Sequence, residues 1–273
     1  SYPIAHPEIK KSPSLILEQV TSFNVEYLAF NTKKKPFDNP LVRKAMAHAI
    51  NKDSIVNIVY DGKATVANSL LPEMSWAYSK DVTTPEYSPD LARTLLTEAG
   101  LTSGFEVDLW AMPIQRAYNP NAKKMAKLIQ ADLAKIGIRI NIIEDYEWRT
   151  FLRKVANGEH EIALVGWSAD HPDPDNFFTP LLSCNASATG NNRAQWCNPE
   201  FDQLLHQALA TNNPLSRKKY YIEAQQIISE NLPVLPIAHA QRFQAKLNTI
   251  KGRILTPFGG VDLSKVEREE VNQ

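Results

Sequence analysis

Patterns typical of β-strands and of α-helices alternate along most of this chain, and this alternation limits the folds that the chain can adopt. Strand patterns, alternating or continuously apolar, cover residues 25–31, 105–111, 138–143 and 162–166. Helical patterns begin at Pro40, in one run with apolar residues up to Ile55, and at Pro89, and they also cover residues 119–137, 148–156, 201–210 and 215–231. Such alternation predicts an α/β fold, with a sheet whose faces are covered by helices.

The two ends of the chain do not continue this pattern. Residues 1–24 and 238–273 lack long helical patterns. We therefore expect both ends to belong to another layer or lobe, which this chain contains only in part.

Composition narrows the class of protein further. Of 273 residues, 43% are hydrophobic, which is enough to bury a core, and 30 basic residues balance 30 acidic ones. Without a basic run, nucleic acid and anionic membranes are unlikely partners. No apolar stretch approaches the roughly 20 residues of a membrane span. The first residues lack the pattern of a secretion signal, so we expect any export signal to have been removed already.

Two cysteines, Cys184 and Cys197, flank the polar segment NASATGNNRAQW. Their spacing is too long for a CxxC redox or zinc motif, so a local disulfide is the better interpretation, and it favours an oxidising compartment such as the periplasm. Two unrelated buried thiols remain the alternative.

The segment GWSADHPDPDNFF, residues 166–178, follows an apolar strand and carries three aspartates. Its position, outside the carboxyl end of a strand, is where open α/β sheets bind ligands. Asp173 and Asp175 stand in turn-forming contexts and favour capping of nearby backbone N–H groups over ligand contact. Asp170 comes right after the strand beside Trp167, and a partly buried carboxylate there would need a cation such as an ammonium group. The segment lacks the glycine and the final glutamate of an EF-hand calcium loop.

A second candidate segment, WAMPIQRAYNPN, runs from Trp110 to Asn121 and also follows a predicted strand. Arg116 offers a planar guanidinium suited to a carboxylate, and Tyr118 offers a hydroxyl on a rigid ring. A surface arginine in a loop is the alternative. Together the two segments offer one negative and one positive anchor at strand ends of the same predicted sheet.

Motifs for a cofactor or for catalysis are not recognisable. The six histidines are scattered without an i, i+4 pair, and neither a nucleophile motif, a glycine-rich phosphate loop nor an HExxH pattern accompanies the aspartates. We therefore predict no metal, no cofactor and no enzymatic activity.

Five parts of the chain resemble the periplasmic dipeptide/oligopeptide-binding proteins of ABC importers, solute-binding protein family 5. In order along the chain they are FNVEYLAFNTKKKPFDNPLVRKAMAHAINKDSIV, WAMPIQRAYNPNAKKMAKLIQADLAKIG, GWSADHPDPDNFF, LLSCNA with QWC, and EAQQIISENLPVLPIAH. The resemblance spans nearly the whole chain. Within the family, the resemblance is greatest to the Sap branch, which is named for sensitivity to antimicrobial peptides. The segments that carry it are NVEYLAFNT, SLLPEMSWAY, NFFTPLLSC and LTPFGG.

The resemblance implies a periplasmic binding protein-like lobe (type II, cluster C) with a mixed sheet flanked by helices, plus strands of a second, incomplete lobe. Family members are roughly twice this length, so the chain is expected to be the C-terminal half. Residues 1–27 would belong to lobe I and the approach to the hinge, residues 28–237 to the ligand-binding lobe II, and residues 238–273 to the return hinge and lobe I.

The family's residue roles carry over to matching positions. The resemblance implies that Asp170 holds the ammonium group of a peptide and that Arg116, in the QR motif, holds its carboxylate. Tyr118 also matches the family, and with Trp167 and Trp110 it would line the pocket, whereas Ala117 departs from the proline of the dipeptide branch. The pair Cys184 and Cys197 matches the family's local disulfide.

We therefore expect a substrate-binding protein in the periplasm of a Gram-negative bacterium. It would capture peptides, cationic antimicrobial peptides among them, and deliver them to an inner-membrane ABC permease together with the missing N-terminal half of the same protein. A haem-binding protein of the same fold is one alternative, and a metal-dependent hydrolase that uses the aspartates is another.

Overall fold

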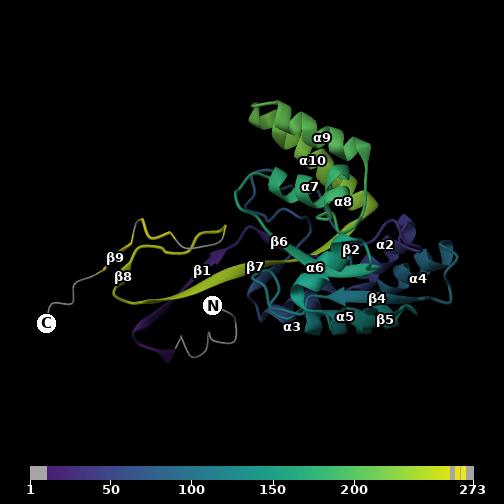
Figure 1. The fold of residues 1–273 in the computed structure, drawn as a ribbon, viewed down its shortest axis with the longest axis horizontal. Helices are drawn as coiled ribbons and strands as arrows, with labels where there is room; N and C mark the ends of the chain where they lie inside the picture. The colour runs from purple at the N-terminus through teal and green to yellow at the C-terminus, as the bar shows by residue number, and fades with distance from the viewer. Residues whose placement is uncertain (1–10, 259–261, 265, 269–273) are drawn as a thin grey trace.

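A seven-stranded sheet organises the protein. The structure is a computed structural model that describes residues 11–258, 262–264 and 266–268 (Figure 1). The strand order is β1-β7-β2-β6-β4-β5, with β3 paired to β7. The strands are β1 (Leu15–Thr21), β2 (Asn24–Phe30), β3 (Ala64–Val66), β4 (Glu106–Ala111), β5 (Arg139–Ile143), β6 (Ile162–Ser168) and β7 (Val234–Leu247), and β8 (Ile250–Lys251) pairs with β9 (Glu267–Arg268) in a separate ribbon.

The sheet is mixed, as expected. Strand β4 runs parallel to both β5 and β6, whereas β2 pairs antiparallel with β6 and β7. Because β4 and β6 are parallel neighbours, with Ala111 opposite Leu164, the segments that follow these two strands leave the same edge of the sheet. This topology places the two candidate segments side by side.

Helices cover the sheet on both sides. In the view of Figure 1, α7 to α10 lie above the sheet, and α3 and α5 lie below it. Their bounds are α2 (Pro40–Ala49), α3 (Lys52–Tyr60), α4 (Pro89–Glu98), α5 (Ala122–Ala134), α6 (Trp148–Ala156), α7 (Asp175–Leu182), α8 (Cys184–Thr189), α9 (Pro199–Ala210) and α10 (Pro214–Asn231).

Asparagine followed by proline opens three of these helices. Asn39, Asn198 and Asn213 each accept a backbone N–H with their side chain, and the next residue is a proline at the first helical position. The asparagine satisfies a free donor, and the proline lacks the N–H that would have no partner there.

The helical run expected from Pro40 to Ile55 is in fact two helices, so that prediction is wrong. The chain is extended at Ile50, and the Asn51 side chain then accepts the backbone N–H of Ser54 as the N-cap of α3. The Asn51 N–H also donates to Asp132 at 2.9 Å. Apolar spacing continues through the break, but the local hydrogen bonds of Asn51 end one helix and start another.

Strand β7 continues from the main body of the sheet into a ribbon with β1, which Figure 1 shows extending away from the helices. Its first half pairs with β2 and β3, and the residues from Gln241 onward pair with β1. The register shifts between Glu26 and Tyr27, where Tyr27 faces Pro236. Proline cannot donate to a strand ladder, so the regular pairing is interrupted at this point.

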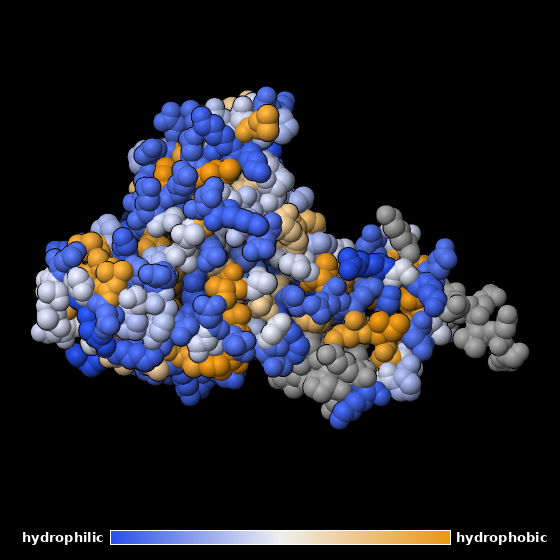
Figure 2. Space-filling view, turned by 180° about the vertical axis from the view of Figure 1, so that it is seen from behind, coloured by the Kyte–Doolittle hydropathy of each residue, from blue (hydrophilic) through white to orange (hydrophobic). Residues whose placement is uncertain are grey.

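The core is one continuous cluster on both faces of the sheet. All seven residues of β2 are buried, including Glu26. The face of the molecule seen in Figure 2 is mostly hydrophilic, with hydrophobic side chains in scattered patches. In the part of the chain that the structure describes, no helix combines the length and apolar character that crossing a membrane requires.

Candidate ligand-binding site

Arg116 and Tyr118 lie in the loop between β4 and α5, and a tight turn fixes this loop. Arg116 and Asn119 exchange two backbone hydrogen bonds, of 2.9 and 3.1 Å. The Tyr60 hydroxyl donates to the Tyr118 carbonyl at 2.6 Å, and Asn121 then caps α5. The loop therefore holds its side chains against the sheet without help from a ligand.

Tyr118 rests directly on Gly166 of β6. A Cβ atom at Gly166 would lie 2.2 Å from the Tyr118 ring, much closer than any side chain could tolerate. Glycine at this strand position is thus required by the ring that covers it. The contact joins the two candidate segments physically.

The Arg116 guanidinium stacks on Trp148, with 4.5 Å between its Cζ atom and the ring centroid. Its Nε is buried and makes no hydrogen bond within the part of the chain that the structure describes. A buried guanidinium N–H without a partner is energetically costly. A hydrogen-bond acceptor placed at this Nε would remove that cost.

A cavity of about 390 Å³, which we call the strand-end cavity, opens where β4 and β6 end. Its walls are mostly apolar and aromatic, with two arginines among them. The lining residues are Tyr27, Met112, Arg116, Ala117, Tyr118, Trp148, Leu152, Val165, Gly166, Trp167, Ser168, Leu181, Asn191 and Arg193. Apolar walls with a few polar groups are typical of small-molecule sites.

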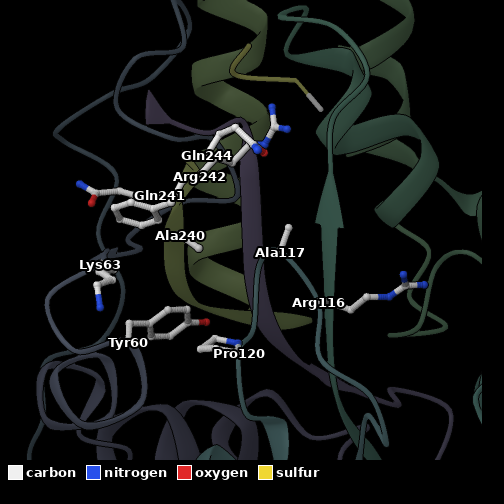
Figure 3. Close-up of a pocket in the computed structure, with 10 residues that line it drawn as sticks. Tyr60, Lys63, Arg116, Ala117, Pro120, Ala240, Gln241, Arg242 and Gln244 are labelled. Carbon is white, nitrogen blue, oxygen red and sulfur yellow. The ribbon is translucent and has the colours of Figure 1, made fainter. Parts of the chain in front are cut away.

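A second cavity of about 310 Å³ lies beside β7, lined by Tyr60, Lys63 and residues 240–244 among others (Figure 3). Figure 3 shows the Arg116 guanidinium pointing away from the other side chains that line it. We therefore take the strand-end cavity, where this guanidinium stacks on Trp148, as the candidate site.

Asp170 follows β6 by two residues, and it is exposed. Asn176 fixes this part of the chain, because its Oδ1 accepts from the Asp170 backbone N–H at 3.2 Å and from Trp167 Nε1 at 3.4 Å. The aspartate carboxylate makes no ion pair with a described residue. It stands beside the cavity rather than in its lining.

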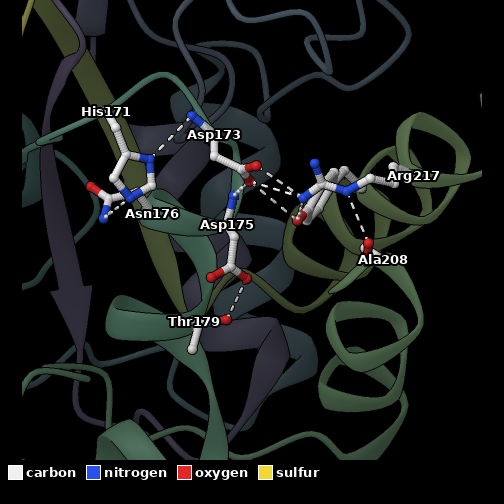
Figure 4. A network of polar contacts seen from close by, with 8 residues as sticks. His171, Asp173, Asp175, Asn176, Thr179, Ala208 and Arg217 are labelled. Atoms are coloured by element: carbon white, nitrogen blue, oxygen red, sulfur yellow. Dashed lines mark hydrogen bonds and ion pairs between the residues drawn. The ribbon is translucent and has the colours of Figure 1, made fainter. Parts of the chain in front are cut away.

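The other two aspartates contact neighbouring residues (Figure 4), and Asp173 caps a backbone N–H group as its turn-forming context predicted. Asp173 Oδ1 accepts the Asp175 backbone N–H at 3.0 Å, and Arg217 Nη2 lies 3.1 and 3.0 Å from the two carboxylate oxygens of Asp173. Asp175 accepts the Thr179 hydroxyl at 2.6 Å, and burial raises the pKa of its carboxyl. Both carboxylates are engaged within the lobe.

Trp110 is 7% exposed and stacks on Tyr146, with 5.1 Å between the ring centroids. It supports the aromatic residues behind the cavity and is absent from the lining described above. A direct contact between Trp110 and a ligand stays a prediction.

The predicted disulfide between Cys184 and Cys197 is present. It closes the segment that contains Asn191 and Arg193, two cavity residues that the sequence patterns did not identify. This segment has neither helical nor strand periodicity, so only the closed loop shows that Arg193 reaches the site.

Glu26 is a further residue that sequence reasoning missed. It is 0% exposed, neither carboxyl oxygen makes a hydrogen bond, and burial raises its pKa well above the ordinary value of 4.5. The neighbouring Asn119 amide opposes this shift but does not meet hydrogen-bond geometry. This buried carboxyl lies next to Asn119, in the loop that carries Arg116 and Tyr118.

The mixed sheet flanked by helices is the fold of the periplasmic binding protein class. More narrowly, the chain belongs to the family described as bacterial extracellular solute-binding proteins, family 5, whose model matches residues 2–189.

Individual relatives agree with this assignment. The chain is 43% identical over 251 residues to the dipeptide-binding protein of Escherichia coli K12, covering 92% of this chain and 47% of the relative. It is 41% identical over 262 residues to the peptide transport periplasmic protein SapA of Salmonella typhimurium, covering 96% and 47%. The crystal structure of a dipeptide binding protein from Pseudoalteromonas sp. SM9913 in complex with Met-Leu superposes with a TM-score of 0.90 at 47% identity, covering 98% of this chain and 53% of that one.

These comparisons confirm the predicted family. A Sap-type protein is among the relatives that are similar to this chain. The chain spans about half the length of the curated relatives it matches.

Proposed function

We propose that this chain forms the ligand-binding lobe of a periplasmic substrate-binding protein, which captures peptides and delivers them to an inner-membrane ABC permease of a Gram-negative bacterium. Relatives named for dipeptide binding and peptide transport support the ligand class. The observation that carries the proposal is Arg116, whose buried Nε lacks a partner at an aromatic cavity. In this role the protein binds its ligand without converting it.

In this proposal the two peptide termini bind opposite charges. The Arg116 guanidinium holds the carboxylate, since its planar N–H groups match two carboxylate oxygens. Asp170 holds the ammonium group just outside the cavity, and Trp167 and Tyr118 provide walls for side chains. Arg116 and Asp170 lie on different loops, so the distance between them would select ligand length.

We also propose that the lobe boundaries lie in β2 and β7, with residues 1–27 and 238–273 joining the other lobe. Residues 1–10, 259–261, 265 and 269–273 of these two segments lie outside the described residues. Support comes from the interrupted pairing at Tyr27 and Pro236, and from the β1 and β7 ribbon that leaves the main body. Closure of two lobes over a ligand would bend the chain at these strands.

The alternatives gain less support. No histidine lines the strand-end cavity, and the buried His160 and His239 bind backbone carbonyls, so axial haem ligation has no candidate among the cavity residues. Among the described residues, no three of His, Cys, Asp or Glu gather where they could hold a metal ion, which leaves the hydrolase without a structural argument.

The test is calorimetric titration of the full-length protein that contains this chain. Wild type, Asp170→Asn and Arg116→Gln variants are titrated with Ala-Ala, its N-acetyl form and its C-terminal amide. We expect each variant to weaken Ala-Ala binding by about 1.5 to 3 kcal/mol, the usual contribution of a charged hydrogen bond. N-acetylation removes the ammonium group of the peptide, so it should weaken binding to the Asp170→Asn variant little further. C-terminal amidation removes the carboxylate of the peptide, so it should weaken binding to the Arg116→Gln variant little further.

A peptide that binds wild type and both variants equally would refute the assigned anchors. Failure of wild type to bind any free peptide would refute the ligand class itself.

A further inference from the structure

The charged groups that line the strand-end cavity are both cations. Arg116 and Arg193 contribute guanidinium groups, and none of the lining residues carries a carboxylate. Asp170, the acidic residue proposed to hold the ammonium group, is exposed beside the cavity. The cavity itself therefore has a positive potential in apolar surroundings, where such a potential is strong.

Arg193 belongs to a loop whose backbone is fixed at several points. The His160 ring Nε2 lies 2.6 Å from the Arg193 carbonyl oxygen. The buried Asn192 side chain donates to the Ser183 and Trp196 carbonyls at 3.1 and 2.7 Å, and Thr32 N donates to the Ala194 carbonyl at 2.8 Å. With the disulfide around it, this loop holds the Arg193 side chain at the cavity before any ligand arrives.

The guanidinium of Arg193 has little within the lobe to balance its charge. One of its nitrogens donates to the Gly190 carbonyl, and no described carboxylate lies within ion-pair distance of it. Burial lowers its pKa, while the phenol groups of Tyr27 and Tyr118 act against that shift. A half-buried cation without a counter-ion is expensive unless a ligand supplies the negative charge.

Charge accounting then predicts the ligand, on the basis of the proposed peptide function. A zwitterionic peptide neutralises Asp170 with its ammonium group and Arg116 with its carboxylate, and it leaves Arg193 unpaired. We infer that Arg193 is a specificity-determining residue that binds an acidic side chain, so that the preferred ligands are short peptides containing glutamate or aspartate. A cationic side chain in the same place would face two arginines and be rejected.

The experiment compares acidic peptides with their uncharged amide counterparts. Full-length wild type, Arg193→Gln and Arg149→Gln proteins are titrated by calorimetry with Ala-Glu and Ala-Gln, and with Glu-Ala and Gln-Ala. In wild type we expect one acidic peptide to bind at least about tenfold more tightly than its amide counterpart. Arg193→Gln should reduce this ratio to about three or less while leaving affinity for the amide peptide nearly unchanged.

Arg149→Gln is the matched control, because Arg149 is exposed on α6 and its loss changes the net charge equally. It should keep the wild-type ratio. Equal binding of acidic and amide peptides by wild type, or a ratio that survives in Arg193→Gln, would overturn the inference and leave the peptide function intact.

Two further outcomes separate the inference from the function on which it rests. If no peptide binds at all, the proposed function and the inference fall together. If haemin binding, and not peptide preference, depends on Arg193, this cation serves the propionate groups of a porphyrin and the inference is wrong.

Discussion

Replacing Glu26 with glutamine should change the stability of the protein more favourably at neutral pH than in mild acid. The Glu26 carboxyl is fully buried without a hydrogen-bond partner, and burial raises its pKa in the folded state well above 4.5. Below pH 4.5 both the folded and the unfolded protein carry this proton. As pH rises, the unfolded chain releases the proton and the folded protein retains it, so stability is lost up to the folded pKa.

The size of the effect follows from the number of pH units. Between 4.5 and the raised folded pKa, each pH unit costs folding of the wild type about 1.36 kcal/mol. The Glu26→Gln variant has no proton to take up and avoids this cost. Its extra amide hydrogen, if left without an acceptor, would reduce the gain by about 1 to 3 kcal/mol.

Urea unfolding followed by circular dichroism at pH 4.5, 6.0 and 7.5 measures this difference. The advantage of Glu26→Gln should increase with each step in pH, relative to the exposed-loop control Glu73→Gln, which should follow wild type. The prediction is refuted if the stability advantage of Glu26→Gln over wild type is the same at all three pH values, or if the variant compares worse with wild type at pH 7.5 than at pH 4.5. Either result would show that the Glu26 carboxylate is ionised and has a partner in the folded protein.

Three further perturbations test the surroundings of the cavity. Replacing both Cys184 and Cys197 with serine should lower the free energy of unfolding by about 3 kcal/mol, because their separation of 13 residues sets the loop entropy; an unchanged urea midpoint would contradict this. Gly166→Ala should cost about 1 to 3 kcal/mol through the clash with Tyr118, and the added Tyr118→Ala change should recover part of this loss unless the clash is relieved elsewhere. For His160, burial lowers the folded pKa from 6.5 to about 4, so its contribution is present above pH 6.5 and lost as pH falls toward 4. Unfolding measurements from pH 7 to pH 4 should therefore show wild type losing about 3 kcal/mol more than His160→Gln, and parallel curves would refute the assignment.

The location of Arg116 and Asp170 at one edge of the sheet could be predicted because it depends on strand order, whereas their roles as ligand anchors stay predictions. Both follow apolar strand patterns, and β4 and β6 proved to be parallel neighbours. Position after a strand is visible in the sequence, and the carboxyl ends of parallel strands meet at one edge. What the sequence did not show is that Asp170 is exposed beside the cavity rather than partly buried within it.

Glu26 and Arg193 could not be predicted, for different physical reasons. In NVEYLAF a glutamate looks like the polar face of a half-exposed strand, but β2 is central in the sheet and buried on both faces. Arg193 lies in a polar, aperiodic segment, and long-range contacts from His160, Thr32 and the disulfide bring it to the cavity. Local patterns contain no information on either tertiary environment.

Helix α7 was missed because its segment has the composition of a loop. Pro174 is the N-cap and Pro180 lies inside the helix, whereas DHPDPD predicts turns. The helix forms where Asp175 accepts the Thr179 hydroxyl, and the fully buried Phe177 and Phe178 anchor it in the core. Tertiary burial of these aromatic residues outweighs the unfavourable local composition.

The three aspartates of the GWSADHPDPDNFF segment divide into two roles, and this division decides the charge of the site. Asp173 neutralises Arg217, whose guanidinium also lies 5.4 Å from the Trp76 ring centroid, so Arg217 connects α10 to the loop. Asp175 faces Thr179 within α7. Because neither carboxylate is available to the cavity, Asp170 alone of the three can offset the two arginines there. With Arg116 and Arg193 in the lining and Asp170 beside it, these three groups together carry an excess of positive formal charge.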